Sequence, residues 1–208
     1  MRETTFTIDS DGVALFVHQW LPDEDKPLRG AIQVSHGMAE HSARYRPLAE
    51  ALTAKGFGVW AHDHRGHGKT AGDVSRRGFF AAKGGWRRVV DDIYLVNAHI
   101  LKNHPGVPRV LFAHSMGAFM AQQVMFERGD EFKAVVLSAS TCGVANPLAP
   151  VGRLIARVER LRLGASTASP LLTKLSFGEF NKPFRPARTE FDWLSRDPAE
   201  VDKYIADP

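Results

Sequence analysis

Short apolar segments alternate with segments of helical periodicity through most of this sequence. The apolar segments lie at residues 31–35, 58–61, 109–113 and 134–138. Helical segments lie between or beside them, at residues 45–55, 86–102 and 116–128. Because strands that are apolar throughout must be covered on both sides, this alternation predicts an α/β fold. We expect a mostly parallel sheet with helices on both faces.

The N-terminal segment follows a different pattern. Residues 4–8 and 13–20 alternate between apolar and polar side chains, and Asp11 and Gly12 stand between the two runs. An Asp-Gly pair flanked by alternating strands is a strong signal for a β-hairpin. We therefore expect a hairpin before the first strand–helix unit.

After Ser138 the pattern changes again. Prolines interrupt short segments, and residues 151–161 have the periodicity of one amphipathic helix. The apolar side of this helix comprises Leu154, Ile155, Val158 and Leu161, and the other side carries Arg153, Arg157 and Arg160. We predict a core over residues 1–141 and a helical cap over residues 142–208 that begins near Cys142.

Composition excludes several classes of protein. The 208 residues, 44% hydrophobic and 24% charged, are typical of a soluble globular domain with an insertion. A single cysteine excludes an internal disulfide and a thiolate-rich metal site. No signal peptide is visible and no apolar run approaches the length of a membrane span, so we expect a cytoplasmic location.

The net charge of +4 is unevenly distributed. The segment from residue 151 to residue 190 contains eight basic residues and three acidic ones. A basic segment can meet nucleic acid, anionic lipid or an acidic substrate, but a solvated surface explains it more simply. We predict no nucleic-acid partner. Peripheral membrane contact through the arginine side of the cap helix stays open, as does the oligomeric state.

A lone serine stands where a predicted strand meets a predicted helix. In the segment RVLFAHSMGAF (residues 109–119), Ser115 is flanked by Ala113 and Gly117. This is the Gly-x-Ser-x-Gly motif of a nucleophilic serine on a sharp turn, with alanine in place of the first glycine. The helix from Met116 would direct free backbone N–H groups toward an oxyanion at the turn. A serine that only caps the helix is the alternative interpretation.

Four motifs in the same order carry a family resemblance. They are HGMAEHSARY (36–45), AHDHRGHGKT (61–70), AHSMGAF (113–119) and FDWLSRDPAEVDKYIADP (191–208). Together they resemble the monoacylglycerol lipase and lysophospholipase branch, of serine aminopeptidase S33 type, of the α/β-hydrolases. The resemblance implies the α/β-hydrolase fold with a cap over an acyl tunnel. It also implies a serine esterase that acts on a small lipid monoester and needs no cofactor.

The resemblance implies roles for individual residues as well. Ser115 is the implied nucleophile, and the backbone amides of Met38 and Met116 are the implied oxyanion hole. The residues implied to hold the alcohol part of the substrate are Glu40, Arg44 and His114. Ala113 departs from the usual glycine, and we expect its methyl group to be tolerated if the neighbouring packing is loose.

Two further motifs invite other functions. Six residues suggest a metal site at first sight: His36, His41, His62, Asp63, His64 and His67. The glycines at 66 and 68 mark a loop, however, and the spacing does not match a metal-binding helix face. The resemblance implies that Asp63 and Arg65 tie this turn, so we predict no metal. Residues 66–70 hint at a phosphate loop, but they lack the full Gly-x-x-x-x-Gly-Lys-Ser/Thr pattern.

A catalytic serine needs a base, and an acid that orients the base. In α/β-hydrolases the acid and then the histidine follow the serine, yet none of the nine histidines follows Ser115, and residues 138–142 hold no carboxylate. The resembled family continues with strands that carry both groups and cover the strand at 134–138. We therefore expect the 208 residues to be the N-terminal portion of a longer enzyme, inactive or nearly so alone. Missing strands supplied by a second chain are the alternative.

Three functions follow from these observations. The leading one is a serine hydrolase that cleaves carboxylic esters of lipids, such as monoacylglycerols or lysophospholipids, through an acyl-enzyme on Ser115. The second is an aminopeptidase of the proline-iminopeptidase kind on the same fold. The third is a non-catalytic ligand-binding homologue. The sequence leaves the natural substrate and its acyl length open.

Overall fold

A six-stranded sheet forms the centre of the fold. The computed structural model describes residues 1–23, 27–141 and 148–207. The strands are β1 (Arg2–Ser10), β2 (Val13–Leu21), β3 (Gly30–Ser35), β4 (Phe57–His62), β5 (Arg109–His114) and β6 (Ala134–Ser138). The helices are α1 (Arg46–Thr53), α2 (Gly68–Ala71), α3 (Gly85–Asn103), α4 (Met116–Arg128), α5 (Ala149–Leu163), α6 (Pro170–Phe177) and α7 (Pro198–Ala206). Short 3-10 turns lie at Ser42–Tyr45, Val74–Arg76, Gly129–Glu131 and Lys182–Phe184.

Strands β1 and β2 form the predicted hairpin. They pair antiparallel along their whole length, from Arg2 opposite Leu21 to Ser10 opposite Val13. The two residues between them both have positive φ, 51° at Asp11 and 77° at Gly12. Turns of this kind match the twist of the flanking strands, which is why the Asp-Gly signal is reliable. The prediction of a hairpin is confirmed.

The other strands form the mostly parallel sheet that the sequence predicts. The order across the sheet is β1-β2-β4-β3-β5-β6. Strand β3 pairs parallel with both β4 and β5, and β5 pairs parallel with β6, whereas β2 joins β4 antiparallel. The carboxyl ends of the four parallel strands therefore meet at one edge, where open α/β sheets bind ligands.

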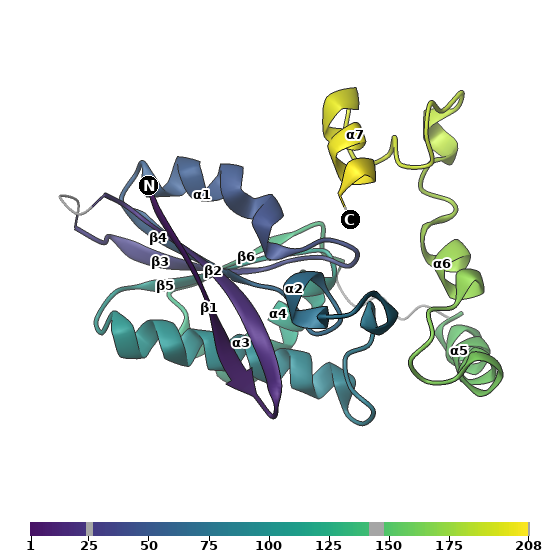
Figure 1. The fold of residues 1–208 in the computed structure, drawn as a ribbon, viewed down its shortest axis with the longest axis horizontal. Helices are drawn as coiled ribbons and strands as arrows, with labels where there is room; N and C mark the ends of the chain where they lie inside the picture. Colours follow the sequence, from purple (N-terminus) through teal and green to yellow (C-terminus); the bar gives the residue numbers. More distant parts are fainter. Residues whose placement is uncertain (24–26, 142–147, 208) are drawn as a thin grey trace. The chain divides into compact units, whose positions relative to one another are not determined.

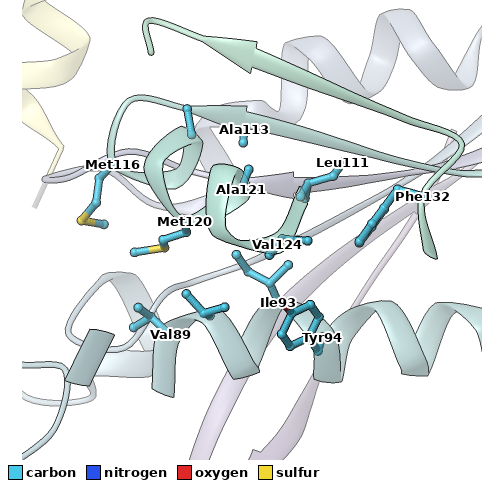
Figure 2. Close-up of a cluster of buried hydrophobic side chains, with 12 residues drawn as sticks. Val89, Ile93, Tyr94, Leu111, Ala113, Met116, Met120, Ala121, Val124 and Phe132 are labelled. Atoms are coloured by element: carbon cyan, nitrogen blue, oxygen red, sulfur yellow. The ribbon is translucent and has the colours of Figure 1, made fainter. Parts of the chain in front are cut away.

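Helices cover both faces of this sheet (Figure 1). Helix α1 packs on one face, where Tyr45 and Ala49 join a buried cluster with Val34 and Val59. Helices α3 and α4 pack on the other face, and their side chains meet those of β5 in the cluster drawn in Figure 2. The face predicted for α3 is fully buried, at Val89, Ile93, Val96 and Ile100. Apolar periodicity therefore identified the helix face that packs on the sheet.

The contacts divide the described chain into two units. The first comprises residues 1–149 with 165–167, and the second comprises residues 150–164 with the chain from residue 168 onward. In the second unit, Glu159 of α5 accepts hydrogen bonds from Arg162 Nε, at 2.8 Å, and from the hydroxyl of Ser169 at the start of α6. The cap boundary predicted near Cys142 lies outside the described residues. None of the described helices combines the length and the apolar character needed to cross a bilayer.

Candidate active site

Ser115 occupies a strained turn between β5 and α4. Its backbone has φ 50° and ψ −116°, a conformation that residues other than glycine rarely adopt. The N–H of Ser115 donates to the carbonyl of Ser138 at 2.9 Å, which ties the turn to the end of β6. The side chain is half-buried. The sharp strand-to-helix turn predicted for this serine is therefore present at the carboxyl edge of the sheet.

Gly117 explains why the turn needs a small residue two positions after the serine. A Cβ atom at Gly117 would lie 2.2 Å from the carbonyl oxygen of Ser35 and 2.6 Å from that of His36. Helix α4 therefore begins directly against the backbone that leaves β3. On the other side of the serine, Ala113 is fully buried among the α3 and α4 side chains, so its methyl group lies inside the core cluster (Figure 2).

The loop after β3 lies against the serine. A Cβ atom built on Gly37 would lie 3.2 Å from Ser115 Cβ and 3.3 Å from His114 Cδ2. Helix α4 begins at Met116, so the amide of this residue has no carbonyl partner within the helix. The Met116 side chain is buried and that of Met38 is 51% exposed. The role of the two amides as an oxyanion hole stays a prediction.

The three predicted substrate-binding residues have defined contacts in this region. Glu40 Oε1 accepts hydrogen bonds from the Gly37 N–H, at 2.5 Å, and from the Tyr45 hydroxyl, at 2.9 Å. Arg44 Nε lies 3.7 Å from Glu40 Oε2. His114 Nδ1 lies 3.0 Å from Ser138 Oγ. Through Gly37, the structure brings Glu40 and His114 close to the serine; their role toward a substrate stays a prediction.

Tyr45 is a member of this site that the sequence analysis missed. Burial, together with the adjacent carboxylate of Glu40, raises the pKa of Tyr45 well above its usual range. The phenol therefore stays protonated and donates to Glu40 at neutral pH. The only signal for it in the sequence is its position at the end of the motif HGMAEHSARY, five residues after the glutamate.

The histidine-rich loop after β4 is held by carboxylates. Asp63 Oδ1 accepts from the Ser42 N–H at 2.8 Å, and its other oxygen accepts from the Lys69 N–H at 2.7 Å. Arg65 and Asp92 form a buried ion pair, with Nε 2.7 Å from Oδ2. These contacts tie the turn in the way that the resemblance implied. Across the described ranges of the chain, no three histidine, cysteine, aspartate or glutamate side chains are grouped to hold a metal ion.

The Arg65–Asp92 pair also reaches the N-terminal hairpin. Arg65 Nη2 donates to the Ser10 carbonyl at 2.9 Å, and the Ser10 hydroxyl donates to Asp92 Oδ1 at 2.6 Å. Both charged side chains are at most 4% exposed. Each partner therefore satisfies the charge of the other in a place where an unpaired charge would be costly.

Four histidines near the carboxyl edge of the sheet are neutral in the folded protein. They are His36, His62, His64 and His67, and burial is the main cause that lowers the pKa of each below its ordinary value of 6.5. His62 is fully buried, and neither of its ring nitrogens has a hydrogen-bond partner among the described residues. Protonation of this ring would place an unsolvated charge in the core.

We expect the folded state to lose stability in acid because of these histidines. The unfolded chain binds their protons near pH 6.5 and the folded chain only at lower pH, so stability is complete above pH 6.5 and falls below it. His62→Leu removes one such group. It should leave the free energy of unfolding at pH 7 within about 1.5 kcal/mol of the wild-type value. Urea unfolding between pH 7.5 and 5 should show a shallower decline in this variant, and an unchanged decline would contradict the prediction.

No base contacts the serine within the part of the chain that the structure describes. Ser115 Oγ has no hydrogen-bond partner there, and the adjacent His114 bonds to Ser138 instead. The end of β6, where some hydrolases carry the acid, supplies a backbone carbonyl to the Ser115 N–H. The described site thus has a nucleophile candidate and N–H donors without a proton acceptor.

Comparisons with known proteins identify the family of this chain. The family model described as serine aminopeptidase, S33, matches residues 26–208. The monoglyceride lipase of Homo sapiens is 32% identical over 97% of this chain, and the monoacylglycerol lipase of Mycolicibacterium smegmatis is 31% identical over 95%. The chain spans 58% and 61% of the lengths of these two relatives.

Solved structures show the same fold. A thermostable carboxyl esterase from Bacillus coagulans, in complex with glycerol, superposes with a TM-score of 0.85 and 27% identity. This alignment covers 100% of this chain and 66% of the esterase. A lipase in an open form gives a TM-score of 0.79 at 25% identity, over 99% of this chain and 66% of the lipase. The chain therefore belongs to the serine aminopeptidase S33 family, has the α/β-hydrolase fold and is similar in sequence to monoglyceride lipases.

Proposed function

We propose that the whole protein is a serine hydrolase that cleaves carboxylic esters of lipids such as monoacylglycerols or lysophospholipids. By the whole protein we mean this chain together with the further length that its relatives have. The observation that carries the proposal is the strained Ser115 turn with the Gly37 loop packed against it. The names of the human and Mycolicibacterium smegmatis relatives support a monoacylglycerol as substrate.

In the proposed reaction, Ser115 Oγ attacks the ester carbonyl and forms an acyl-enzyme. The N–H groups of Met38 and Met116 donate to the oxyanion of the tetrahedral intermediate. The serine proton passes to a histidine, which then protonates the departing alcohol. None of the nine histidines follows Ser115 in residues 116–208, so we expect the base and its acid in the further length of the whole protein. On its own, the 208-residue chain should hydrolyse esters poorly or not at all.

The alcohol part of the substrate is proposed to contact Glu40, Arg44 and His114. Glu40 and His114 both lie next to Gly37, beside the serine, and offer a carboxylate and an imidazole to hydroxyl groups. Glycerol, which the Bacillus coagulans esterase structure contains, has the hydroxyl groups that such side chains bind. These contacts favour a polyol ester over a simple alkyl ester.

An aminopeptidase is the second candidate, because the family description names that activity. Assays of the whole protein with monoacylglycerols, p-nitrophenyl esters and aminoacyl-anilides separate the two. We expect turnover of the esters and at least about 100-fold slower turnover of the anilides, because the Glu40 carboxylate beside the serine already accepts hydrogen bonds from the Gly37 N–H and the Tyr45 hydroxyl. Preferential cleavage of anilides would overturn the lipase assignment. Tight ester binding without any turnover would favour a non-catalytic homologue.

Contact of the cap with a membrane surface is a further part of the proposal. Helix α5 exposes Leu154 and Leu161, the latter at 87%, alongside the arginines at positions 153, 157 and 160. Apolar side chains beside basic ones are typical of helices that rest on anionic lipid. A solvated charged face explains the same arginines, so peripheral membrane binding stays a prediction. The cytoplasmic location is likewise a prediction.

A further inference from the structure

His36 lies between the end of β3 and the loop that carries the proposed oxyanion donor. Its ring is fully buried. One ring nitrogen, Nδ1, lies 2.7 Å from the carbonyl oxygen of Gly37, and the other, Nε2, lies 2.9 Å from the backbone nitrogen of His64. Both ring nitrogens therefore contact backbone groups, one in the loop after β3 and one just after β4.

These two partners determine where the ring carries its proton. A carbonyl oxygen can only accept a hydrogen bond, so Nδ1 of His36 must be the donor to Gly37. A backbone N–H can only donate, so Nε2 must be the unprotonated acceptor from His64. The ring is therefore the neutral Nδ1–H tautomer. A second proton, on Nε2, would face the His64 N–H directly.

The surroundings of the ring oppose that second proton. The rings of His64 and His67 lie 4.2 Å and 5.3 Å from His36, centroid to centroid. Burial is the main cause that lowers the pKa of His36 well below 6.5, and His67, His62 and His41 lower it further. His36 therefore keeps both of its hydrogen bonds across the neutral pH range.

The hydrogen bond to Gly37 acts on the neighbouring residue through a rigid unit. The carbonyl of Gly37 and the N–H of Met38 belong to one planar trans peptide and point in opposite directions. The orientation of the carbonyl therefore sets the orientation of the N–H. On its other side, Gly37 is held by its own N–H, which donates to Glu40 at 2.5 Å, while Tyr45 holds that carboxylate. The two peptide groups of Gly37 are thus fixed next to Ser115.

We propose that His36 is a positioning residue, which orients the Met38 N–H toward the oxyanion by donating a hydrogen bond to the Gly37 carbonyl. The proposal rests on the proposed function, because Met38 matters only if Ser115 forms a tetrahedral intermediate. His36 touches no reacting atom in this scheme. Its hydrogen bond to Gly37 acts on catalysis, while its hydrogen bond to His64 joins the ends of two neighbouring strands.

Two substitutions separate these hydrogen bonds. In His36→Asn, the amide nitrogen can take the place of Nδ1 and donate to Gly37, but the His64 N–H loses its acceptor. In His36→Gln, the longer amide can replace Nε2 as the acceptor, but the Gly37 carbonyl loses its donor. Each variant keeps one bond and loses one, so thermal unfolding should show similar destabilisation in both.

The kinetics of the two variants in the whole protein should differ. We expect His36→Gln to lower kcat about 100-fold with little change in KM. A misdirected Met38 N–H no longer stabilises the oxyanion, and the oxyanion forms only as the reaction proceeds and not in the bound substrate. His36→Asn should keep kcat within about threefold of the wild type, because its amide nitrogen can still donate to the Gly37 carbonyl. Equal kcat values for the two variants, or a change confined to KM, would overturn the proposal.

A spectroscopic measurement tests the hydrogen bond itself. The ¹⁵N chemical shifts of the His36 ring in the 208-residue chain should show a protonated Nδ1 and a bare Nε2 from pH 8 down to pH 6. A protonated Nε2 would overturn the proposal without any assay. If the wild-type whole protein hydrolyses no ester, the proposed function fails, and the ¹⁵N shifts still decide whether His36 holds Gly37.

Discussion

Ser115→Ala is expected to lower kcat for ester hydrolysis by the whole protein about a million-fold. Removal of the nucleophile of a serine triad costs on the order of this factor, because the acyl-enzyme can no longer form. The residual rate comes from N–H groups that still stabilise the oxyanion when water attacks. Steady-state assays on a monoacylglycerol measure the loss. A fluorophosphonate probe, followed by mass spectrometry of the labelled peptide, should modify Ser115 in the wild type and nothing in the variant.

Ser75→Ala is a matched control for this experiment. Ser75 is an exposed serine in a short 3-10 turn, so its replacement removes the same hydroxyl from a place far from the proposed chemistry in the sequence. Activity and labelling should match the wild type. Probe labelling that persists in Ser115→Ala would show that another residue is the nucleophile, and the assignment of the site would then be wrong.

Gly117→Ala is expected to destabilise the folded chain by at least about 3 kcal/mol. The added Cβ would lie 2.2 Å from the Ser35 carbonyl oxygen, and both partners of this clash are backbone. Strand β3 cannot move away without breaking its pairing with β4 on one side and β5 on the other. The loss is measurable as a lower free energy of unfolding in urea, or as failure of the chain to fold.

Gly129→Ala provides the comparison at the other end of α4. This glycine has φ −60° and nothing within 4 Å of an added Cβ, so alanine fits its backbone and its surroundings. We expect a change within about 1 kcal/mol, in the stabilising direction, because alanine reduces the freedom of the unfolded chain. Equal effects at the two positions would mean that the close approach at Gly117 does not hold the helix against β3.

Local patterns predicted most of the core. Alternation and an Asp-Gly pair identified the hairpin, and short apolar runs identified both ends of each strand from β3 to β6 within one residue. Helices α6 and α7 were not predicted as separate elements, although the sequence placed both in a helical cap. Propensity is a weak guide for segments of this length.

The candidate site was predictable where it depends on motif and not where it depends on contact. Ser115 and Gly117 follow from a motif that demands small residues around a strained turn. No motif predicts the hydrogen bond from the Gly37 N–H to Glu40 or the tautomer of His36. Both depend on distances between atoms that only the folded chain supplies. The hydrogen bond between Ser10 and Asp92 joins residues 82 positions apart, a separation that no periodicity reveals.

The buried Arg65–Asp92 pair has a consequence for the cooperativity of unfolding. An outer hairpin of a sheet is ordinarily free to fray before the rest of the domain opens. Here the last residue of β1, Ser10, completes the hydrogen bonds of both charged partners, and Arg65 belongs to the loop that follows β4 at the carboxyl edge of the sheet. Detachment of the hairpin would leave these charges partly unsatisfied inside the protein. The first strands are therefore expected to open together with the carboxyl edge of the sheet and not ahead of it.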